Sequence, residues 1–504
     1  MSDQELHAVT EGLRTLAQDL HAITQAERGP LWLTLDQGGH ASRAIVFDNA
    51  GRAVAQAFAP INTQYLDGER VEHAPLDMVQ SLRTVLMDVA QSLGRDVDRI
   101  EAAGLATQRS SIVCWQADTG LPLSPVLSWQ DRRNDALIQQ LQDQREQIQA
   151  ITGLVLSPHY GASKMRWCLD NLPAVQAALA QQQLRCGPLS SYLLHTLLIE
   201  QPTLVDPANA SRTQLWSPSQ TQWSPQLLQW FGVPAQCLPQ SVPTWHAYGH
   251  LLLGSRQIPL RVCTGDQAAV PFANGALDRD CIYINLGTGA FALAPLTTEV
   301  KQAAPLLRSV LYSNAAQLTY ALEGTVNGAA SALHWLAERS GLDVQRASLA
   351  LQRSQLPADL PLFINGVGGV GSPFWLPQLE SRFVNTENRQ ADETAQLAAV
   401  VESIAFLLTA NIERMREQVP TLSRLLLGGG LSSCTYLCQC LADLNQLPIT
   451  RLSERELTAR GLAYLVADQP ADWPTDPLTS VFQPQPYPNL MARQARWLQQ
   501  MQAV

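Results

Sequence analysis

The chain has 504 residues and a formal net charge of −10, and its charged residues are spread along the sequence. A chain of this length exceeds what one hydrophobic core usually holds, so we expect two large domains. The acidic balance argues against nucleic acid or an anionic membrane as the main partner.

The nine cysteines are an odd number in a long chain, so they do not predict a disulfide framework. The closest group, Cys434, Cys438 and Cys440, lacks the paired spacing and the histidines of a zinc site. No charged and then apolar leader opens the chain, and no apolar run approaches the roughly 20 residues needed to span a bilayer. These features predict a cytoplasmic protein with reduced cysteines.

Residues 1–30 precede the first predicted strand and have the pattern of a helix. Apolar residues recur there at alternating spacings of three and four, which is a heptad seam. They are Leu6, Val9, Leu13, Leu16, Leu20 and Ile23. We interpret the segment as an N-terminal helical extension, which either packs on its own domain or forms a contact in a homo-oligomer.

Residues 33–48 have the pattern of a strand, a tight glycine turn and a return strand. Asp36 stands where the first strand ends, Gly38 lies in the turn, and Arg43 stands where the second strand begins. Successive N–H groups in such a turn form an anion-binding concavity. A carboxylate beside it is well placed to hold Mg²⁺, the counter-charge that phosphates need. An ordinary hairpin has the same pattern, and the rest of the chain decides between the two.

From residue 31 onward, short apolar strands alternate with helical stretches, which is typical of an α/β domain. The predicted strand 102–107 ends in Gln108 and Arg109, and a later one ends near Trp129. Ligands usually bind at the carboxyl ends of such strands. Arg109 offers a planar fork of donors and Trp129 a flat apolar wall, although a surface ion pair and a core aromatic explain them equally well.

A further strand resumes near residue 261 and ends in Gly265, Asp266 and Gln267. An aspartate at this place serves as a general base, as a metal ligand or as a turn residue. Gly-Asp pairs are frequent in loops, so the turn residue is the commonest of these roles.

The strand, glycine turn and strand recur at residues 282–294, around Gly287, Thr288 and Gly289. Repetition on this scale predicts two related domains that face each other across a cleft, each with a backbone nest for the same phosphate chain. A third glycine cluster at 428–430 follows another apolar strand and opens a helix, where its backbone can approach a nucleotide.

This order of parts resembles the superfold of actin, hexokinase and the heat-shock chaperones. Within it, the sequence is similar to the FGGY family of carbohydrate kinases, and most similar to the glycerol kinases in that family. The matching stretches run from about 31 to 468 and are Asp36-Gln37-Gly38, Ser42-Arg43, Val71-Glu72-His73, Gln108-Arg109, Trp129 to Arg133, Asn209 to Thr213, Gly265-Asp266-Gln267, Gly287-Thr288-Gly289, Ala321-Leu322-Glu323-Gly324 and Gly428-Gly429-Gly430.

The resemblance implies an α/β fold of two duplicated ribonuclease H-like domains facing across a cleft, which bind ATP and Mg²⁺. We place the N-terminal kinase domain, with the substrate site and the first phosphate turn, at residues 31–276. The C-terminal, nucleotide-binding domain follows at 277–470, and a C-terminal tail at 471–504.

The resemblance also implies the site residues. Asp266 matches the catalytic base and Asp36 the carboxylate associated with the metal. The positions that match substrate contacts are Arg109, Ser110, Trp129, His159, Asp266, Gln267 and Phe291. Those that match nucleotide contacts are Gly38, His40, Arg43, Gly287, Thr288, Ala330, His334, Gly429 and Gly430.

Several of these positions depart from the pattern of the glycerol kinases. Ser110 stands in place of a glutamate and His159 in place of a tyrosine. The loss of one charge-assisted hydrogen bond weakens binding by roughly 1.5–3 kcal/mol, and the extra room admits a longer polyol or a sugar. Gly39 and His40 stand in place of threonines that bind phosphate.

On the nucleotide side, further residues depart from the pattern. They are Ala330 for a glycine, His334 for a glutamine, Cys434 for an asparagine and Leu376 for an aspartate. We therefore expect ATP-dependent phosphorylation of a primary hydroxyl of a small polyol or sugar. The alternatives are a kinase for a ketopentose or four-carbon sugar alcohol, and a catalytically weak regulatory homologue.

Overall fold

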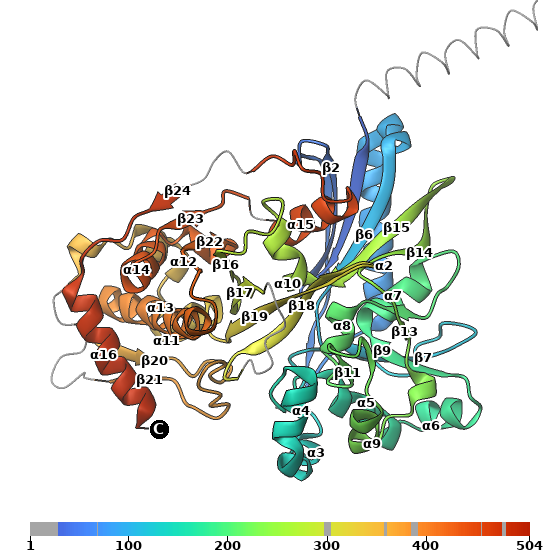
Figure 1. Ribbon diagram of the computed structural model, residues 1–504, viewed down its shortest axis with the longest axis horizontal. Helices are drawn as coiled ribbons and strands as arrows, with labels where there is room; N and C mark the ends of the chain where they lie inside the picture. Colours follow the sequence, from blue (N-terminus) through green and yellow to red (C-terminus); the bar gives the residue numbers. More distant parts are fainter. Residues whose placement is uncertain are drawn as a thin grey trace, which may run out of the picture.

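The computed structural model describes residues 29–67, 69–296, 304–356, 360–384, 392–454, 456–475 and 480–503. The predicted helix over residues 1–28 lies outside these ranges. The described chain forms two lobes, the first blue to green and the second yellow to red (Figure 1).

A six-stranded sheet forms the centre of the first lobe. Its order is β14 (Trp245–Leu253), β15 (Arg256–Gly265), β6 (Ile100–Thr107), β1 (Leu31–Gln37), β2 (Ala41–Asp48) and β3 (Ala53–Pro60). Strand β6 runs parallel to both β1 and β15, and the other neighbours are antiparallel. Strands β1 and β6 are buried along nearly their whole length, as their apolar sequences require.

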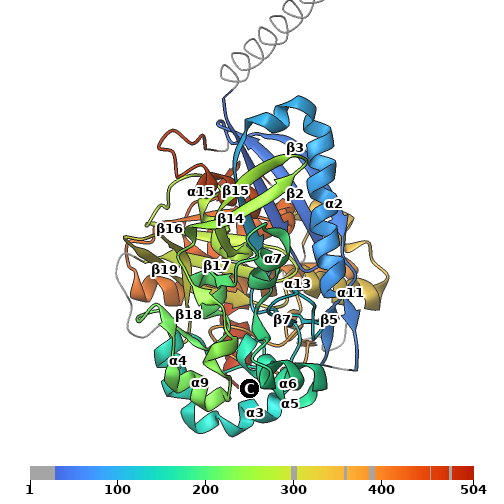
Figure 2. The ribbon, with the colours of Figure 1, turned by 90° about the vertical axis from the view of Figure 1, so that its right-hand side faces the viewer.

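Helices cover both faces of this sheet. Helix α2 (Pro75–Leu93) packs on β2 and β3, and Figure 2 shows it along one side of the lobe. Proline at its first turn and Gly94, with φ of 56°, after its last residue set its ends. Helix α15 (Leu457–Val466) packs on β1 and β6 from the other face. Because α15 comes from the second half of the sequence, the hydrophobic layer beneath it joins the two lobes.

The second lobe is built on a seven-stranded sheet. Its order is β18 (Leu307–Ser313), β19 (Leu318–Val326), β17 (Ala290–Pro295), β16 (Cys281–Leu286), β22 (Arg424–Gly428), β23 (Ile449–Arg451) and β24 (Ser480–Phe482). Strands β19, β17, β16, β22 and β23 repeat the order and the directions of β3, β2, β1, β6 and β15. The predicted duplication is confirmed.

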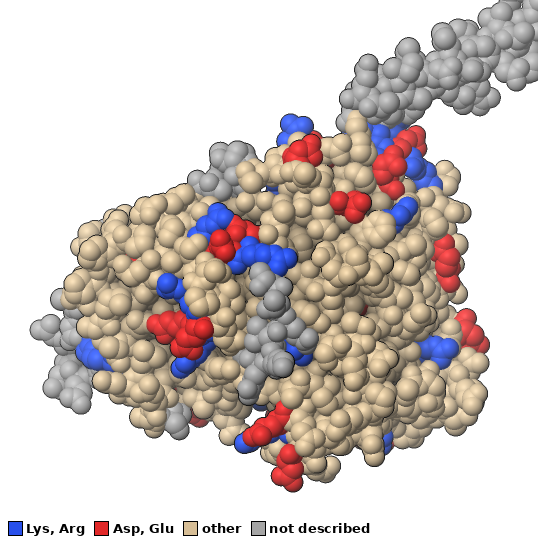
Figure 3. All heavy atoms as spheres, in the orientation of Figure 1, with Lys and Arg blue, Asp and Glu red and all other residues tan. Residues whose placement is uncertain are grey.

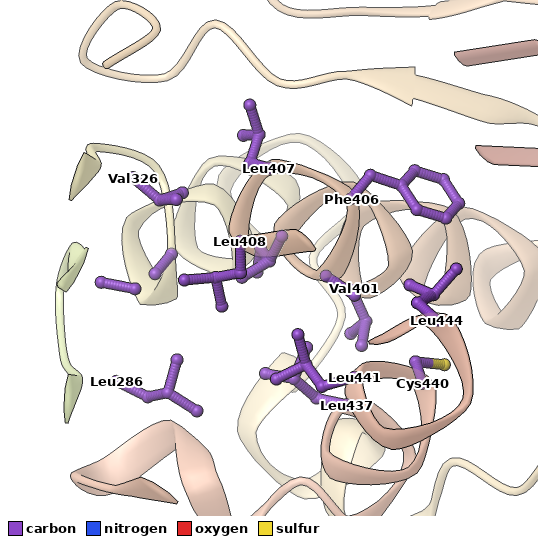
Figure 4. Packing of buried hydrophobic residues seen from close by; sticks show 14 of the residues in the cluster. Leu286, Val326, Val401, Phe406, Leu407, Leu408, Leu437, Cys440, Leu441 and Leu444 are labelled. Carbon is purple, nitrogen blue, oxygen red and sulfur yellow. The ribbon is translucent and has the colours of Figure 1, made fainter. Parts of the chain in front are cut away.

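Helix α13 (Glu393–Gln418) forms the core of the second lobe. Asp392 caps it by accepting from the N–H of Ala395 at 2.6 Å, and Pro420 follows its end. Its apolar side chains interdigitate with those of α14 (Thr435–Asn445) in Figure 4. Burial on nearly every side explains why α13 is apolar all round instead of amphipathic.

Among the described residues, α13 is the one helix long and apolar enough to cross a membrane, but 94% of its apolar window is buried inside the structure. The expectation that no apolar stretch approaches that length was wrong for this helix. Polar residues interrupt the apolar stretch in the sequence, and several of them form hydrogen bonds inside the structure. Asn411, for example, donates to the carbonyl of Ser372 at 2.8 Å.

The remaining strands are short. A five-stranded sheet joins β4 (Gln64–Tyr65), β5 (Val71–His73), β8 (Val126–Leu127), β7 (Ile112–Gln116) and β9 (Leu184–Pro188). The two-stranded pairs are β10 (Leu204–Val205) with β13 (Gln240–Ser241), β11 (Trp216–Ser217) with β12 (Gln222–Trp223), and β20 (Leu362–Ile364) with β21 (Arg382–Val384).

The remaining helices surround these strands. In the first lobe they are α3 (Asp135–Gln140), α4 (Arg145–Thr152), α5 (Gly161–Asn171), α6 (Pro173–Ala180), α7 (Leu189–Leu197), α8 (Pro207–Ser211), α9 (Pro225–Phe231) and α10 (Asp266–Ala269). In the second lobe they are α11 (Ala330–Ser340), α12 (Val344–Ala350) and α16 (Pro488–Gln502).

The predicted tail contains α16, which contributes Leu490, Trp497 and Met501 to the core of the second lobe. This part of the tail therefore belongs physically to that lobe. All nine cysteines are buried and free, as expected of reduced thiols. Charged side chains of both signs are scattered over the face shown in Figure 3.

Candidate active site

The register of the first sheet brings three loops to one edge. Gln37 at the end of β1 and Gly265 at the end of β15 both pair with Thr107 at the end of β6. Because the three strands are parallel, the residues after them emerge side by side. The first glycine turn, Arg109 and Asp266 therefore meet at this edge.

Asp36 and Arg43 face each other across the first hairpin, where they form a cross-strand pair. Arg43 Nη1 lies 3.0 Å from Asp36 Oδ2, and Arg43 Nε lies 3.4 Å from Glu456 Oε2, just before α15. Burial raises the pKa of the Asp36 carboxyl to about 7, and nearby Asp266 and Glu456 add to the effect while Arg43 opposes it. The carboxylate is thus costly to ionise without a further cation.

The other oxygen of this carboxylate, Asp36 Oδ1, is buried and has no hydrogen-bond partner among the described residues. Mg²⁺ takes oxygen ligands and is commonly held by one or two carboxylates together with water and phosphate. A free, buried carboxylate oxygen beside a glycine turn fits that requirement. In the part of the chain that the structure describes, no three His, Cys, Asp or Glu side chains gather to hold a metal by themselves.

Asp266 is the first residue of α10, directly after β15. Its Oδ1 accepts from the N–H of Gln267 at 2.7 Å, which fixes the carboxylate at the start of the helix. Burial raises the pKa of Asp266, and Arg109 opposes the shift. Gln267 is held in turn, because its Oε1 accepts from Asn285 Nδ2 at 3.0 Å across the lobes.

The second and third glycine turns meet at the corresponding edge of the second sheet. The N–H of Gly287 donates to the carbonyl of Gly289 at 2.9 Å, which closes the turn after β16. Gly429, with φ of 88°, passes so close that a Cβ would lie 2.6 Å from Asn285 Oδ1 and from the carbonyl oxygen of Leu286. Only glycine is compatible with this approach. Gly430 follows with open space around it.

Helix α11 begins against the second turn. The N–H of Ala330 donates to the carbonyl of Gly287 at 3.1 Å, and Thr288 is exposed beside it. His334 lies one turn further along α11 and is exposed, and its Nε2 lies 3.9 Å from Glu338 Oε1. His40 is exposed as well and follows Gly39 in the first turn. The predicted nucleotide roles of these residues stay predictions.

Two of the predicted substrate residues, Phe291 and Asp266, lie against Arg109. Its guanidinium lies 5.8 Å from the centroid of the Phe291 ring, and its Nε lies 3.8 Å from Asp266 Oδ1. Trp129 is 36% exposed, and a Cβ on Gly39 would lie 3.8 Å from its indole nitrogen. The substrate side and the first phosphate turn are therefore neighbours.

Ser110 and His159 both lie near the backbone of Trp129, whose N–H donates to Ser111 Oγ at 2.9 Å. Ser110 has a φ of 65°, a left-handed conformation that costs free energy for a non-glycine residue. His159 Nδ1 lies 3.1 Å from the carbonyl oxygen of Trp129, so this nitrogen carries the proton and Nε2 is left as an acceptor. Burial lowers the pKa of His159 to about 4, which keeps the ring neutral.

Lys164 on α5 connects the segments that contain Ser110, Ser128 and His159 through hydrogen bonds to their backbone. Its ammonium group donates to the carbonyls of Ser110 at 3.2 Å, Ser128 at 2.7 Å and His159 at 2.8 Å. The side chain is fully buried, and burial lowers its pKa to about 7. The sequence shows Lys164 as one of two lysines but does not indicate this role.

We expect Lys164→Met to leave three buried carbonyls without their donor, which destabilises the fold by about 3 kcal/mol. Because the loops are then no longer held in place, KM for the acceptor should also rise about tenfold or more, while KM for ATP changes little. Urea unfolding and steady-state kinetics check both. Arg166→Met, on the outer face of the same helix, is the matched control. An unchanged KM for the acceptor in folded Lys164→Met would contradict the assignment.

Comparison with known proteins identifies the class. The chain has the two-domain fold of the actin and hexokinase-like ATPases. Its structure matches that of a Plasmodium falciparum glycerol kinase with ADP at a TM-score of 0.83, with 20% identity over 94% of this chain and 98% of that one. A xylulose kinase from Brucella ovis matches at a TM-score of 0.82 and 22% identity, with the same coverage.

The chain belongs to the FGGY family of carbohydrate kinases. Residues 31–282 match the model of the family's N-terminal domain and residues 282–467 that of its C-terminal domain. Glycerol kinases from Shewanella sp. strain ANA-3 and Polaromonas sp. strain JS666 are 31% and 32% identical over 448 and 451 residues, which is 86% of this chain and 89% of each relative. The protein is a carbohydrate or polyol kinase.

Proposed function

We propose that the protein transfers the γ-phosphoryl group of ATP to a primary hydroxyl of a small polyol or sugar, with Mg²⁺ bound at Asp36. The observation that carries the proposal is the pair of carboxylates at one sheet edge. Burial raises the pKa of both Asp36 and Asp266. Asn285, which lies next to the second and third glycine turns of the other lobe, donates to Gln267 beside Asp266. Such an arrangement suits phosphoryl transfer, which needs positioning, charge neutralisation and one base.

Asp266 takes the role of the base in this proposal. A general base works best when its pKa lies near the working pH, and burial moves this carboxyl in that direction. The hydrogen bond from the N–H of Gln267 holds it in place at 2.7 Å. Asp266 would accept the proton of the acceptor hydroxyl, while Arg109 and Trp129 orient the carbon chain.

The glycine turns at 38–39, 287–289 and 429–430 would bind the nucleotide through backbone N–H groups and by close approach. Mg²⁺ would supply the counter-charge for the phosphates when bound to the free oxygen of Asp36. Closure of the lobes would exclude water, which favours transfer to a hydroxyl over hydrolysis.

A second candidate is a kinase for a ketopentose or a four-carbon sugar alcohol. The short side chain of Ser110 and the neutral His159 favour it, because neither supplies a charged acceptor for the two hydroxyls of glycerol that do not react. The free Nε2 of His159 accepts a hydrogen bond from a further hydroxyl instead. A larger pocket with fewer charges suits a longer acceptor.

A panel of polyols and sugars tests both candidates by ADP release, corrected for ATP hydrolysis without acceptor. We expect turnover with at least one acceptor, and the second candidate predicts the highest kcat/KM for a four- or five-carbon compound. Ser110→Glu is the informative variant, since a restored carboxylate should improve glycerol relative to longer acceptors by about tenfold. ATP binding without ADP release on any acceptor would instead support a regulatory homologue.

A further inference from the structure

Glu323 on β19 is a single carboxylate in an otherwise apolar and uncharged strand segment, and it is fully buried. It binds two arginines from the opposite lobe, which the sequence does not reveal. Arg109 follows β6, and Arg212 follows the short helix α8. The Glu323 side chain is therefore an ion-pair centre between the lobes, placed directly behind the proposed substrate site.

This carboxylate accepts four hydrogen bonds. Arg109 donates from Nη1 to Oε2 at 2.9 Å and from Nη2 to Oε1 at 3.2 Å. Arg212 Nη2 also donates to Oε2, and Ser309 Oγ donates to Oε2 at 2.7 Å. Burial alone would raise the pKa of Glu323, but the two guanidinium groups hold it at about 2. The group is ionised at every working pH.

Arg109 thus stands between two carboxylates. Its two terminal nitrogens are taken by Glu323, and only Nε points toward Asp266, at 3.8 Å from Oδ1. That distance is too long for a hydrogen bond. The stem of Arg109 has little freedom, because a Cβ on Gly265 would lie 2.6 Å from its Cγ and Cδ. Only the guanidinium end can change its partner.

We propose that Glu323 is a positioning residue, which holds the Arg109 guanidinium away from a closed ion pair with Asp266 and so keeps that base open to the acceptor hydroxyl. The inference rests on the proposed function. Without the Glu323 charge, Arg109 is a buried cation whose nearest remaining anion is Asp266, and an uncompensated buried charge is strongly unfavourable. Arg109 would then pair with the base and occupy the place of the hydroxyl.

The same ion pair links substrate binding to the arrangement of the lobes. Glu323 and Ser309 belong to the second sheet, and Arg109 and Arg212 to the first lobe. Any movement that separates the lobes at this point must release Arg109 from Glu323. The geometry of the acceptor site therefore depends on the lobe contact, not only on the loops of the first lobe.

A second buried ion pair in the same lobe provides a matched control. Arg493 donates to Glu402 from Nε at 2.7 Å and from Nη2 at 2.6 Å, and both side chains are 1% exposed. This pair joins α16 to α13 within the second lobe and has no contact with the proposed site. Neutralising Glu402 removes a comparable interaction without touching Arg109.

The experiment compares Glu323→Gln with Glu402→Gln in the full chain. Glu323→Gln should raise KM for the acceptor about tenfold or more, with KM for ATP within about twofold. It should also move the acid limb of the kcat/KM profile to lower pH by at least about half a unit. Two effects lower the pKa of Asp266: the Glu323 anion is lost, and Arg109 pairs with Asp266. The other charged group facing Asp266 is Asp36, which is unchanged.

Glu402→Gln should lower the melting temperature while leaving KM and the pH profile as in the wild type. If Glu323→Gln does not fold, Ser309→Ala is the milder variant, since it removes one donor and keeps the charge. It should raise KM for the acceptor in the same direction. Glu323→Asp should restore the pH profile, because the anion remains. An acceptor KM and an acid limb that both stay unchanged in folded Glu323→Gln would overturn the proposal.

Failure of the proposed function is distinguishable from failure of this inference. A wild type that releases no ADP with any acceptor refutes the proposed function. The positioning role still predicts faster amide exchange at residues 108–111 and 265–267 in Glu323→Gln and not in Glu402→Gln. Equal exchange in the two variants would overturn the inference on that measurement.

Discussion

Asp266→Asn is expected to reduce kcat by about 10³-fold or more while the protein folds and binds ATP normally, because general base catalysis contributes about 10²–10⁴-fold. The amide has nearly the same shape, and its oxygen still accepts from the N–H of Gln267, so the start of α10 stays in place. What disappears is the group that takes the proton from the acceptor hydroxyl. Steady-state ADP release measures kcat, and calorimetric titration measures the binding of ATP.

The pH profile gives this prediction a second readout. Burial raises the pKa of Asp266, so wild-type kcat/KM should fall as the pH drops through that pKa and the base becomes protonated. Residual activity of Asp266→Asn should lack this limb. Asp280→Asn, an exposed carboxylate before β16, is the matched control and should behave as the wild type. Normal turnover by Asp266→Asn would refute the base assignment.

Asp36→Asn is expected to lower activity by about 10²-fold and, without Mg²⁺, to stabilise the protein. The folded pKa of Asp36 is about 7 against an ordinary 3.8. A raised carboxyl pKa means that its contribution to stability is present below about pH 4 and is lost as the pH rises through 7. Asparagine avoids this loss, so the gain should be largest near pH 8, at about 2 kcal/mol after the lost ion pair with Arg43 is discounted. Thermal unfolding at pH 5 and pH 8 checks the sign.

Magnesium provides a test of Asp36 that is independent of activity. Mg²⁺ with an ATP analogue should raise the melting temperature of the wild type more than that of Asp36→Asn, because the buried Oδ1 is the proposed ligand. Asp206→Asn is the matched control, since burial raises the pKa of Asp206 to about 6 but its carboxylate caps α8 through Ala208 and Asn209. Its response to Mg²⁺ should be that of the wild type. An identical response of Asp36→Asn would contradict the metal assignment.

Much of the fold is predictable from the sequence because its signals are local. The first and second glycine turns each stand between two apolar strands, and the repeat of that unit predicts the duplication that β1–β2 and β16–β17 confirm. The convergence of Asp36, Arg109 and Asp266 is also predictable, since each lies at or just after the carboxyl end of a strand of the same sheet. The common location of such residues can be predicted from the rule that ligands bind at the carboxyl ends of parallel strands, without knowledge of long-range contacts.

The contacts between the lobes are not predictable in this way. Glu323 and Arg109 are 214 positions apart, and nothing near either residue specifies the partner. The same holds for Glu456, which reaches Arg43 only because α15 packs back on the first sheet. Lys164 is noticeable in the sequence, but its three carbonyl partners come from loops of irregular backbone. Residues whose roles arise from the assembly of two lobes require the structure.

The most direct test of the central claim is identification of the phosphorylated product by ³¹P NMR. Wild-type protein with ATP, Mg²⁺ and the preferred acceptor of the panel should form a phosphomonoester on a terminal carbon, with one ADP released for each ester formed. Asp266→Asn under the same conditions should leave ATP largely unconsumed. Release of ADP and inorganic phosphate without an ester, with every acceptor, would contradict phosphoryl transfer to a primary hydroxyl.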